Sequence, residues 1–179
     1  MNSQTPLIRA PSGARVAPRL MTGPHDSTFS ADADANQYLT FMLDQEAYGL
    51  DLLTVQEIKG LNAITRMPNT AAHLRGVTNL RGQVIPILDL RTLFKLPERS
   101  YDKWTVFVIV HVEGRVVGLV VDAVDDVVDI APSAIQPPPD LAAARGASLV
   151  RGIARVGERL IALLDIERVI GNELASVAA

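Results

Sequence analysis

The feature that most constrains the fold of this chain is a series of short apolar runs, rich in β-branched residues and separated by turn-forming residues. Branched side chains suit the pleated, half-buried surface of a sheet, and such short runs are typical of strands rather than helices. Between residues 38 and 52 apolar residues also recur at near-alternating positions, as on a strand with one buried face. We therefore expect strands there and over residues 55–58, 77–80, 84–90, 106–112, 116–121, 124–130 and 160–164.

Three breaks between these runs are short and contain glycine, at residues 81–83, 113–115 and 156–159. Glycine adopts a positive φ at little steric cost, as the tight turn of a β-hairpin requires. Three hairpins predict a mostly antiparallel arrangement. Pro86 falls inside one expected strand, and since proline has no amide donor, we expect an edge, a bulge or a strand end there. The clearest helical pattern is the amphipathic segment 166–177.

The sequence also echoes itself. Leu74-Arg75-Gly76-Val77 is matched by Val150-Arg151-Gly152-Ile153, and this offset of 76 residues persists to an aspartate in each copy, Asp89 and Asp165. A weaker echo, at an offset of 69, sets Tyr48-Gly49-Leu50 against Val117-Gly118-Leu119. Two related β units are the simplest explanation, and chance similarity between apolar strand pairs remains the alternative. Many short strands with closing hairpins favour small barrels.

Composition excludes several classes of protein. A chain of 179 residues has single-domain length, and 48% hydrophobic residues suffice for a core. The absence of cysteine excludes disulfides, thiolate metal sites and a cysteine nucleophile, and a net charge of −3 with 4% aromatic residues argues against nucleic-acid binding. No apolar run approaches the roughly 20 residues that a membrane-spanning helix needs, so we expect no membrane insertion. Residues 1–36 lack an apolar period, which predicts a flexible N-terminal extension without a signal peptide.

Residues that could carry chemistry are few and scattered. His25, His73 and His111 lie far apart without a serine or acidic pattern around them, so no catalytic triad is expected. Four aspartates at 122, 125, 126 and 129 lack the glycine and terminal glutamate of a calcium loop, and a solvated face is the simpler interpretation. We expect no enzymatic activity, no cofactor and no metal. A small-molecule-binding or enzymatic barrel, which would need a deep pocket with perturbed titratable groups, is the rival hypothesis.

Three segments carry more information than periodicity does. They are Tyr48-Gly49-Leu50-Asp51 with Val55-Gln56-Glu57-Ile58, Arg75-Gly76-Val77-Thr78-Asn79-Leu80-Arg81-Gly82, and Ile85-Pro86-Ile87-Leu88-Asp89-Leu90-Arg91. Together they resemble the CheW family of chemotaxis coupling proteins over residues 37–172. The resemblance implies a mostly β fold of two SH3-like five-stranded β-barrel subdomains packed together, with a short C-terminal helix and a tail at 173–179. It also implies a non-enzymatic cytoplasmic adaptor, recruited to membrane receptor clusters and assembled into receptor–kinase arrays.

The same resemblance implies the partners and a site. The partners are the regulatory domain of the CheA histidine kinase and the cytoplasmic tip of transmembrane chemoreceptors, and a pathway other than motility is the alternative. The receptor-facing groove maps onto Val55, Glu57, Asn79, Leu80, Arg81 and Gly82. Val55 and Leu80 would supply apolar area to a receptor helix, although core packing stays open for both. Arg81 would pair with Glu57 or a receptor carboxylate, and an ordinary surface ion pair stays open. No motif matches the kinase contact, so those residues stay unassigned.

Overall fold

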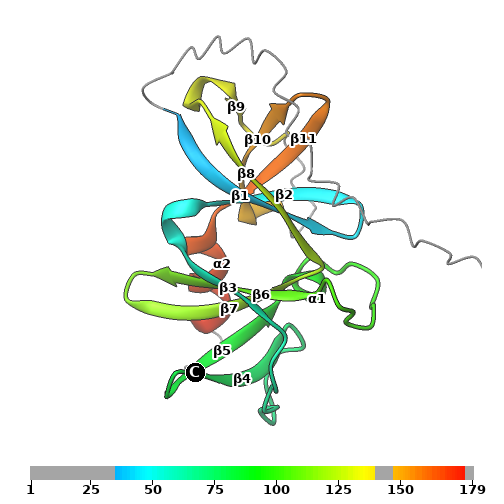
Figure 1. Ribbon diagram of the computed structural model, residues 1–179, viewed down its shortest axis with the longest axis vertical. Helices are drawn as coiled ribbons and strands as arrows, with labels where there is room; N and C mark the ends of the chain where they lie inside the picture. Colours follow the sequence, from blue (N-terminus) through cyan, green and yellow to red (C-terminus); the bar gives the residue numbers. More distant parts are fainter. Residues whose placement is uncertain (1–34, 140–146, 176–179) are drawn as a thin grey trace, which may run out of the picture. The chain divides into compact units, whose positions relative to one another are not determined.

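The structure is a computed structural model that describes residues 35–139 and 147–175, which all belong to one compact unit (Figure 1). Strands dominate it. They are β1 (Asn36–Leu43), β2 (Glu46–Asp51), β3 (Val55–Gly60), β4 (Leu74–Leu80), β5 (Gln83–Asp89), β6 (Val106–Val112), β7 (Arg115–Val121), β8 (Ala123–Ile130), β9 (Ile135–Gln136), β10 (Val150–Val156) and β11 (Arg159–Leu164). The α-helices are α1 (Leu90–Leu93) and α2 (Ile166–Ala175), and short 3-10 turns are η1 (Leu52–Thr54), η2 (Pro132–Ala134) and η3 (Ala147–Leu149).

The strands form two sheets, so the predicted mostly β fold with a short C-terminal helix is confirmed. The first sheet has six strands in the order β8-β1-β2-β11-β10-β9, and the second has five in the order β3-β6-β7-β5-β4. The sixth strand of the first sheet is β9, which has only two residues. Among the described residues no ladder joins the outer strands of either sheet, and one bridge, Thr65 with Val77, links the segment after β3 to β4.

The two halves of the chain exchange one strand. β3 follows β2 along the chain but pairs with β6 at the edge of the second sheet, and β8 follows β7 but pairs with β1 at the edge of the first. With β9 set aside, the two strand orders match position by position, including one parallel pair in each sheet. The echoed segments fall on equivalent strands, β4 with β10 and β2 with β7. A repeat of topology as well as sequence favours duplication over chance.

All three predicted hairpins are confirmed: β4–β5, β6–β7 and β10–β11 pair antiparallel across turns that contain Gly82, Gly114 and Gly157, each with a positive φ. Pro86 lies in an interior strand rather than at an edge. The register places it opposite Val77, and the parallel ladder between β5 and β7 begins only at the next residue, Ile87. The missing amide donor therefore falls where that ladder has not yet started.

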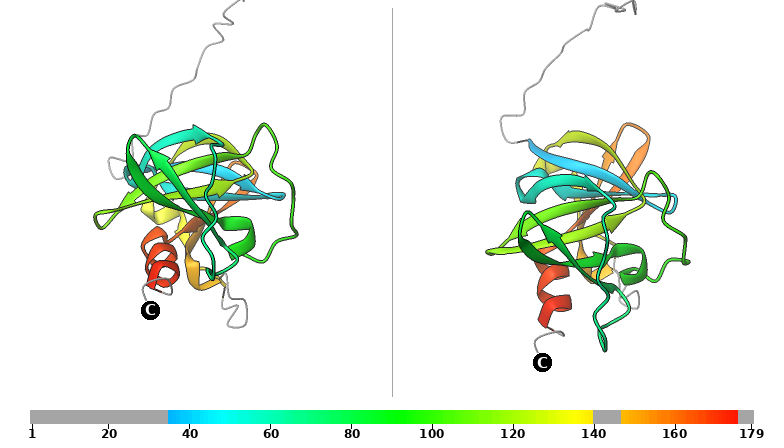
Figure 2. Two further views of the ribbon diagram at one scale, coloured as in Figure 1. Left: turned by 90° about the horizontal axis from the view of Figure 1, so that it is seen from below. Right: turned by 60° about the horizontal axis from the view of Figure 1, so that its bottom comes forward.

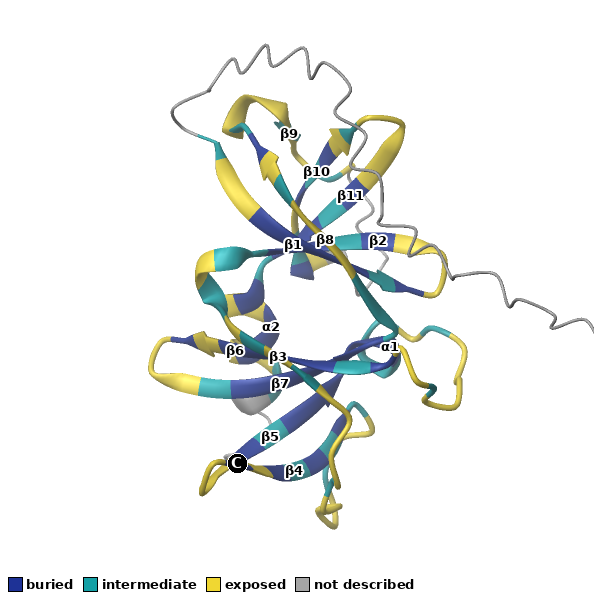
Figure 3. Cartoon of the chain, in the orientation of Figure 1, coloured by how far each residue is buried: buried dark blue, intermediate teal, exposed yellow. Residues whose placement is uncertain are grey.

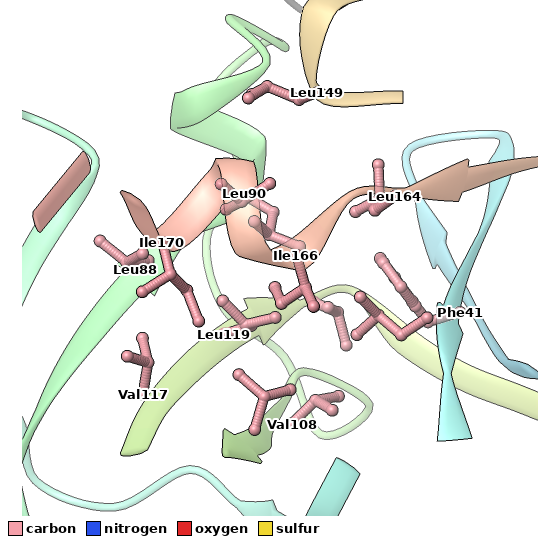
Figure 4. Packing of buried hydrophobic residues seen from close by; sticks show 14 of the residues in the cluster. Phe41, Leu88, Leu90, Val108, Val117, Leu119, Leu149, Leu164, Ile166 and Ile170 are labelled. Atoms are coloured by element: carbon pink, nitrogen blue, oxygen red, sulfur yellow. The ribbon is translucent and has the colours of Figure 1, made fainter. Parts of the chain in front are cut away.

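A shared core joins the sheets. Phe41 and Leu164 from the first sheet, Leu119 from the second, and Ile166 and Ile170 from α2 are buried in one cluster (Figure 4). α2 thus lies where strands of both sheets meet, and Figures 2 and 3 show the helix beside the sheets and the buried positions along the central strands. Each such buried large aliphatic side chain contributes about 1.5–3 kcal/mol. Smaller clusters fill the interior of each sheet, around Leu163 and around Ile87.

The sequence repeat extends to the first residues of the two α-helices. The carboxylate of Asp89 accepts a hydrogen bond from the amide of Thr92 at the start of α1, and that of Asp165 accepts one from the amide of Arg168 at the start of α2. Each aspartate is therefore an N-cap that satisfies an otherwise unpaired donor. The predicted helix 166–177 is described to Ala175. Most of the predicted extension 1–36 and part of the tail 173–179 lie outside the described residues, so those domain boundaries stay predictions.

Candidate partner-binding site

The hairpin between β4 and β5 presents Arg81 at its tip. Leu80 pairs with Gln83, so Arg81 and Gly82 are the two turn residues, and both have a positive φ, 50° and 87°. Positive φ at both positions defines the type I′ turn, whose twist matches that of the strands. The side-chain oxygen of Asn79 accepts a hydrogen bond of 2.8 Å from the amide of Gly82. The backbone of the turn is therefore held in a defined conformation, from which the Arg81 side chain projects.

Arg81 reaches the outer strand on the other side of the same sheet. Its Nη2 donates to Oε2 of Glu57 on β3 at 2.8 Å, and the Arg81 side chain is 71% exposed whereas that of Glu57 is 22% exposed. The second oxygen of Glu57, Oε1, is buried and has no hydrogen-bond donor among the described residues. Such an orphaned acceptor is costly unless a donor completes it. The predicted proximity of Glu57 and Arg81 is thus present in the fold.

The six residues predicted for this site differ in exposure. Asn79, Arg81 and Gly82 are exposed at the hairpin, and Glu57 is half-buried. Val55 is half-buried against the core that both sheets share. Leu80 is only 5% exposed and packs in the interior of the second sheet. Core packing, the alternative left open for Leu80, describes its position.

Two exposed apolar residues, one on β3 and one in the β4–β5 hairpin, were not predicted from the sequence. Ile58, next to Glu57 on β3, is 46% exposed, and Val84, paired with Asn79 across the hairpin, is 65% exposed. Apolar residues inside strand patterns are expected to be buried, and the periodicity gave no sign that these two face outward. We define the hairpin surface as Glu57, Ile58, Asn79, Arg81 and Val84.

A groove of about 460 Å³ adjoins the hairpin surface and is lined by Asn62, Ala63, Thr65, Val77, Thr78, Asn79 and Val84. The segment after β3 forms one wall, held to β4 by two backbone hydrogen bonds of 2.8 and 2.9 Å between Thr65 and Val77. Gly76 makes this crossing possible. Its φ is 140°, and a Cβ there would lie 2.1 Å from the carbonyl oxygen of Thr65, so no other residue fits without movement of the backbone.

The histidines and aspartates considered as catalytic or metal-binding residues do not come together in one site. His111 is exposed, His73 contacts Glu173 on α2, and His25 lies outside the described residues. Asp122 and Asp125 pair with arginines, Arg91 and Arg159, and the part of the chain that the structure describes holds no group of three or more His, Cys, Asp or Glu side chains arranged to bind a metal. Within that same part, no helix has the length and apolarity to cross a membrane.

Comparison with known proteins gives consistent matches. A family model described as a CheW-like domain matches residues 37–174. The "Chemotaxis protein CheW" of Klebsiella aerogenes is 40% identical over 147 residues, which are 82% of this chain and 89% of that protein. A "Probable chemotaxis protein CheW" of Rhizobium etli is 32% identical over 143 residues, 80% of this chain and 92% of that protein. Among solved structures, the scaffolding protein TtCheW from Thermoanaerobacter tengcongensis superposes with a TM-score of 0.69 at 34% identity, covering 73% of this chain and 89% of that one.

Proposed function

The chain belongs to the family of proteins with a CheW-like domain, and on that basis we propose that it is a non-enzymatic adaptor in bacterial chemotaxis signal transduction. It couples transmembrane chemoreceptors to the CheA histidine kinase. The names of its relatives as chemotaxis proteins, and of a structural neighbour as a scaffolding protein, support this role. The same proposal places the protein in the cytoplasm, recruited to receptor clusters and incorporated into receptor–kinase arrays.

The receptor site in this proposal comprises the hairpin surface, which makes the contact, and Val55, Leu80 and Gly82, which support it. The observation that carries it is the ion pair of Arg81 and Glu57, which joins a rigid turn to an outer strand next to exposed apolar side chains. Ile58 and Val84 supply apolar area to a helical partner, and Arg81 fixes its orientation by charge complementarity. The unpaired Oε1 of Glu57 accepts a donor once the partner displaces or completes the ion pair.

Leu80, Gly82 and Val55 hold the contacting residues of the site in position rather than touching the partner. Leu80 anchors the base of the turn in the sheet interior, so that Arg81 projects from a fixed backbone. Gly82 allows the turn because its φ of 87° suits glycine. Val55 packs against the shared core and sets the course of β3 toward Glu57. Residues that contact the kinase stay unassigned.

Binding of the purified full chain to the regulatory domain of CheA and to a receptor signalling fragment, each alone and then together, tests the proposal. An adaptor binds both partners and retains the two in one complex. The matched variants are Arg81→Glu and Arg115→Glu, since Arg115 is an exposed arginine at the β6–β7 hairpin of the same sheet. Loss of receptor binding in Arg81→Glu alone supports the site. A folded chain that binds neither partner contradicts the adaptor role.

A further inference from the structure

A second cavity, distinct from the groove beside the hairpin, lies next to β4 of the five-stranded sheet and is lined by three arginines. It measures about 410 Å³ and is lined by Asn62, Ile64, Arg66, Arg75, Arg99, Ser100 and Tyr101. None of these residues belongs to the hairpin surface. They come from the segment after β3, from β4 and from the loop before β6. The chain as a whole carries a net charge of −3, so a concentration of cations is a local feature of this cavity.

The carboxylates that pair with two of these arginines do not line the cavity. Asp89 is buried and its carboxylate already accepts three hydrogen bonds: from Nε of Arg75 at 2.8 Å, from the hydroxyl of Tyr101 at 2.9 Å and from the amide of Thr92 at 3.2 Å. Asp102 caps its own loop through the amides of Trp104 and Thr105 and also accepts from Nη2 of Arg99 at 2.8 Å. Neither acid therefore has its charge on the walls of the cavity.

Most N–H donors of these guanidinium groups make no hydrogen bond to the residues that the structure describes. Nε of Arg75 donates to Asp89 and its Nη2 donates to Thr92, while Nη2 of Arg99 donates to Asp102. Arg66 is exposed and has no ion pair with any residue that the structure describes. Each guanidinium has five N–H donors in a planar fork that matches an oxyanion. Arg75 and Arg99 are each paired with one carboxylate, whereas Arg66 pairs with none in the described part of the chain, so a bound anion compensates the remaining positive charge of the three arginines.

We propose that this cavity binds an acidic segment of a protein partner, whose carboxylates take the unused donors of Arg66, Arg75 and Arg99. The volume exceeds what a single carboxylate fills and falls in the range of cavities that hold larger ligands. Asn62, Arg66, Arg99, Ser100 and Tyr101 are all exposed, so a polypeptide reaches the cavity without any rearrangement of the sheet. The ring of Tyr101 and the side chain of Ile64 provide apolar wall beside the charges.

The test is isothermal titration of the full chain with a short acidic peptide, acetyl-EEDE-amide, with its neutral counterpart acetyl-QQNQ-amide, and with inorganic phosphate. Backbone amide shifts measured by NMR locate the site, and residues 62–66, 75 and 99–101 are expected to move. The acidic peptide binds, more weakly as salt is raised, and the neutral peptide does not. Arg66→Ala lowers the affinity by about fivefold, as expected for one exposed charge pair.

Arg115→Ala is the matched control, since it removes an exposed arginine elsewhere on the same sheet and leaves peptide affinity unchanged. Equal binding of the two peptides, binding of phosphate without the acidic peptide, or an equal loss in Arg115→Ala overturns the proposal. Because Arg66 lies outside the hairpin surface, Arg66→Ala is expected to bind the receptor fragment normally. Failure of the cavity proposal is thus separable from failure of the adaptor proposal.

Discussion

Reversal of the charge at Arg81 separates a role in partner binding from a role in stability. Arg81 is 71% exposed, so its ion pair with Glu57 contributes only about 0.5 kcal/mol to the free energy of unfolding. Arg81→Glu removes this attraction and places two carboxylates side by side, for a total cost of about 1 kcal/mol. The backbone adds nothing, because both residues carry a Cβ at the same φ of 50°.

The expected effect on binding is larger. If a receptor fragment docks on the hairpin surface, Glu at position 81 opposes the partner's complementary charge, and the affinity falls about tenfold or more. The double variant Arg81→Glu with Glu57→Arg restores the ion pair in reverse. It is expected to recover the free energy of unfolding but not the affinity, because the partner still meets the wrong charge at the tip.

Two measurements are made on the unaltered chain, Arg81→Glu, Glu57→Arg and the double variant. Urea unfolding gives the free energy of unfolding, and titration calorimetry with the receptor signalling fragment gives the affinity. Full recovery of affinity in the double variant would refute the reasoning, since the pair would then act only by holding β3 and the hairpin together. Unchanged affinity in Arg81→Glu would remove Arg81 from the site.

Three further outcomes test the fold around the site. Measured by urea unfolding, Gly76→Ala lowers the free energy of unfolding by about 3 kcal/mol through strain and overpacking. Gly157→Ala lowers it by only about 1 kcal/mol, because nothing lies within 4 Å of the new Cβ. Arg91→Leu leaves the half-buried Asp122 without its cation and lowers the free energy of unfolding by about 3 kcal/mol, again in urea; a loss under 1 kcal/mol contradicts a structural role. Burial, followed by its hydrogen bond to a buried carboxylate, raises the pKa of Tyr101 from 10.0 to about 12, so its contribution to stability is complete below pH 10 and lost as pH rises toward 12. Burial also raises the pKa of Tyr48, so ultraviolet titration should show more than one late tyrosine transition, of which Tyr101→Phe removes the one near pH 12.

Much of the sheet structure could be predicted from local patterns. β-Branched runs and glycine turns are short-range signals, so the predicted strand 106–112 coincides with β6, and the turn at 81–83 joins β4 to β5. The exchange of β3 and β8 between sheets could not be predicted in this way. It depends on which edge a strand pairs with, a long-range choice that leaves no local pattern.

The ion pair of the candidate site could be predicted from the sequence, but the exposure of the residues around it could not. The resemblance brought Glu57 and Arg81 together, and the fold places them in contact. Exposure depends on how a sheet curves and on what covers each face, so Leu80 is buried whereas Ile58 and Val84 face outward. The three arginines of the second cavity are spread over more than 30 residues of sequence. The bridge between Thr65 and Val77 brings the segment of Arg66 to β4, and the hydrogen bond from the hydroxyl of Tyr101 to Asp89 holds the loop of Arg99 nearby.

Co-sedimentation of CheA with receptor-containing vesicles, in the presence and absence of this chain, tests the adaptor proposal most directly. The account predicts that the kinase sediments with the vesicles only when the chain is added, and that Arg81→Glu reduces the bound fraction while Arg115→Glu does not. Equal sedimentation of the kinase with and without the chain would contradict the proposal that this protein couples the two.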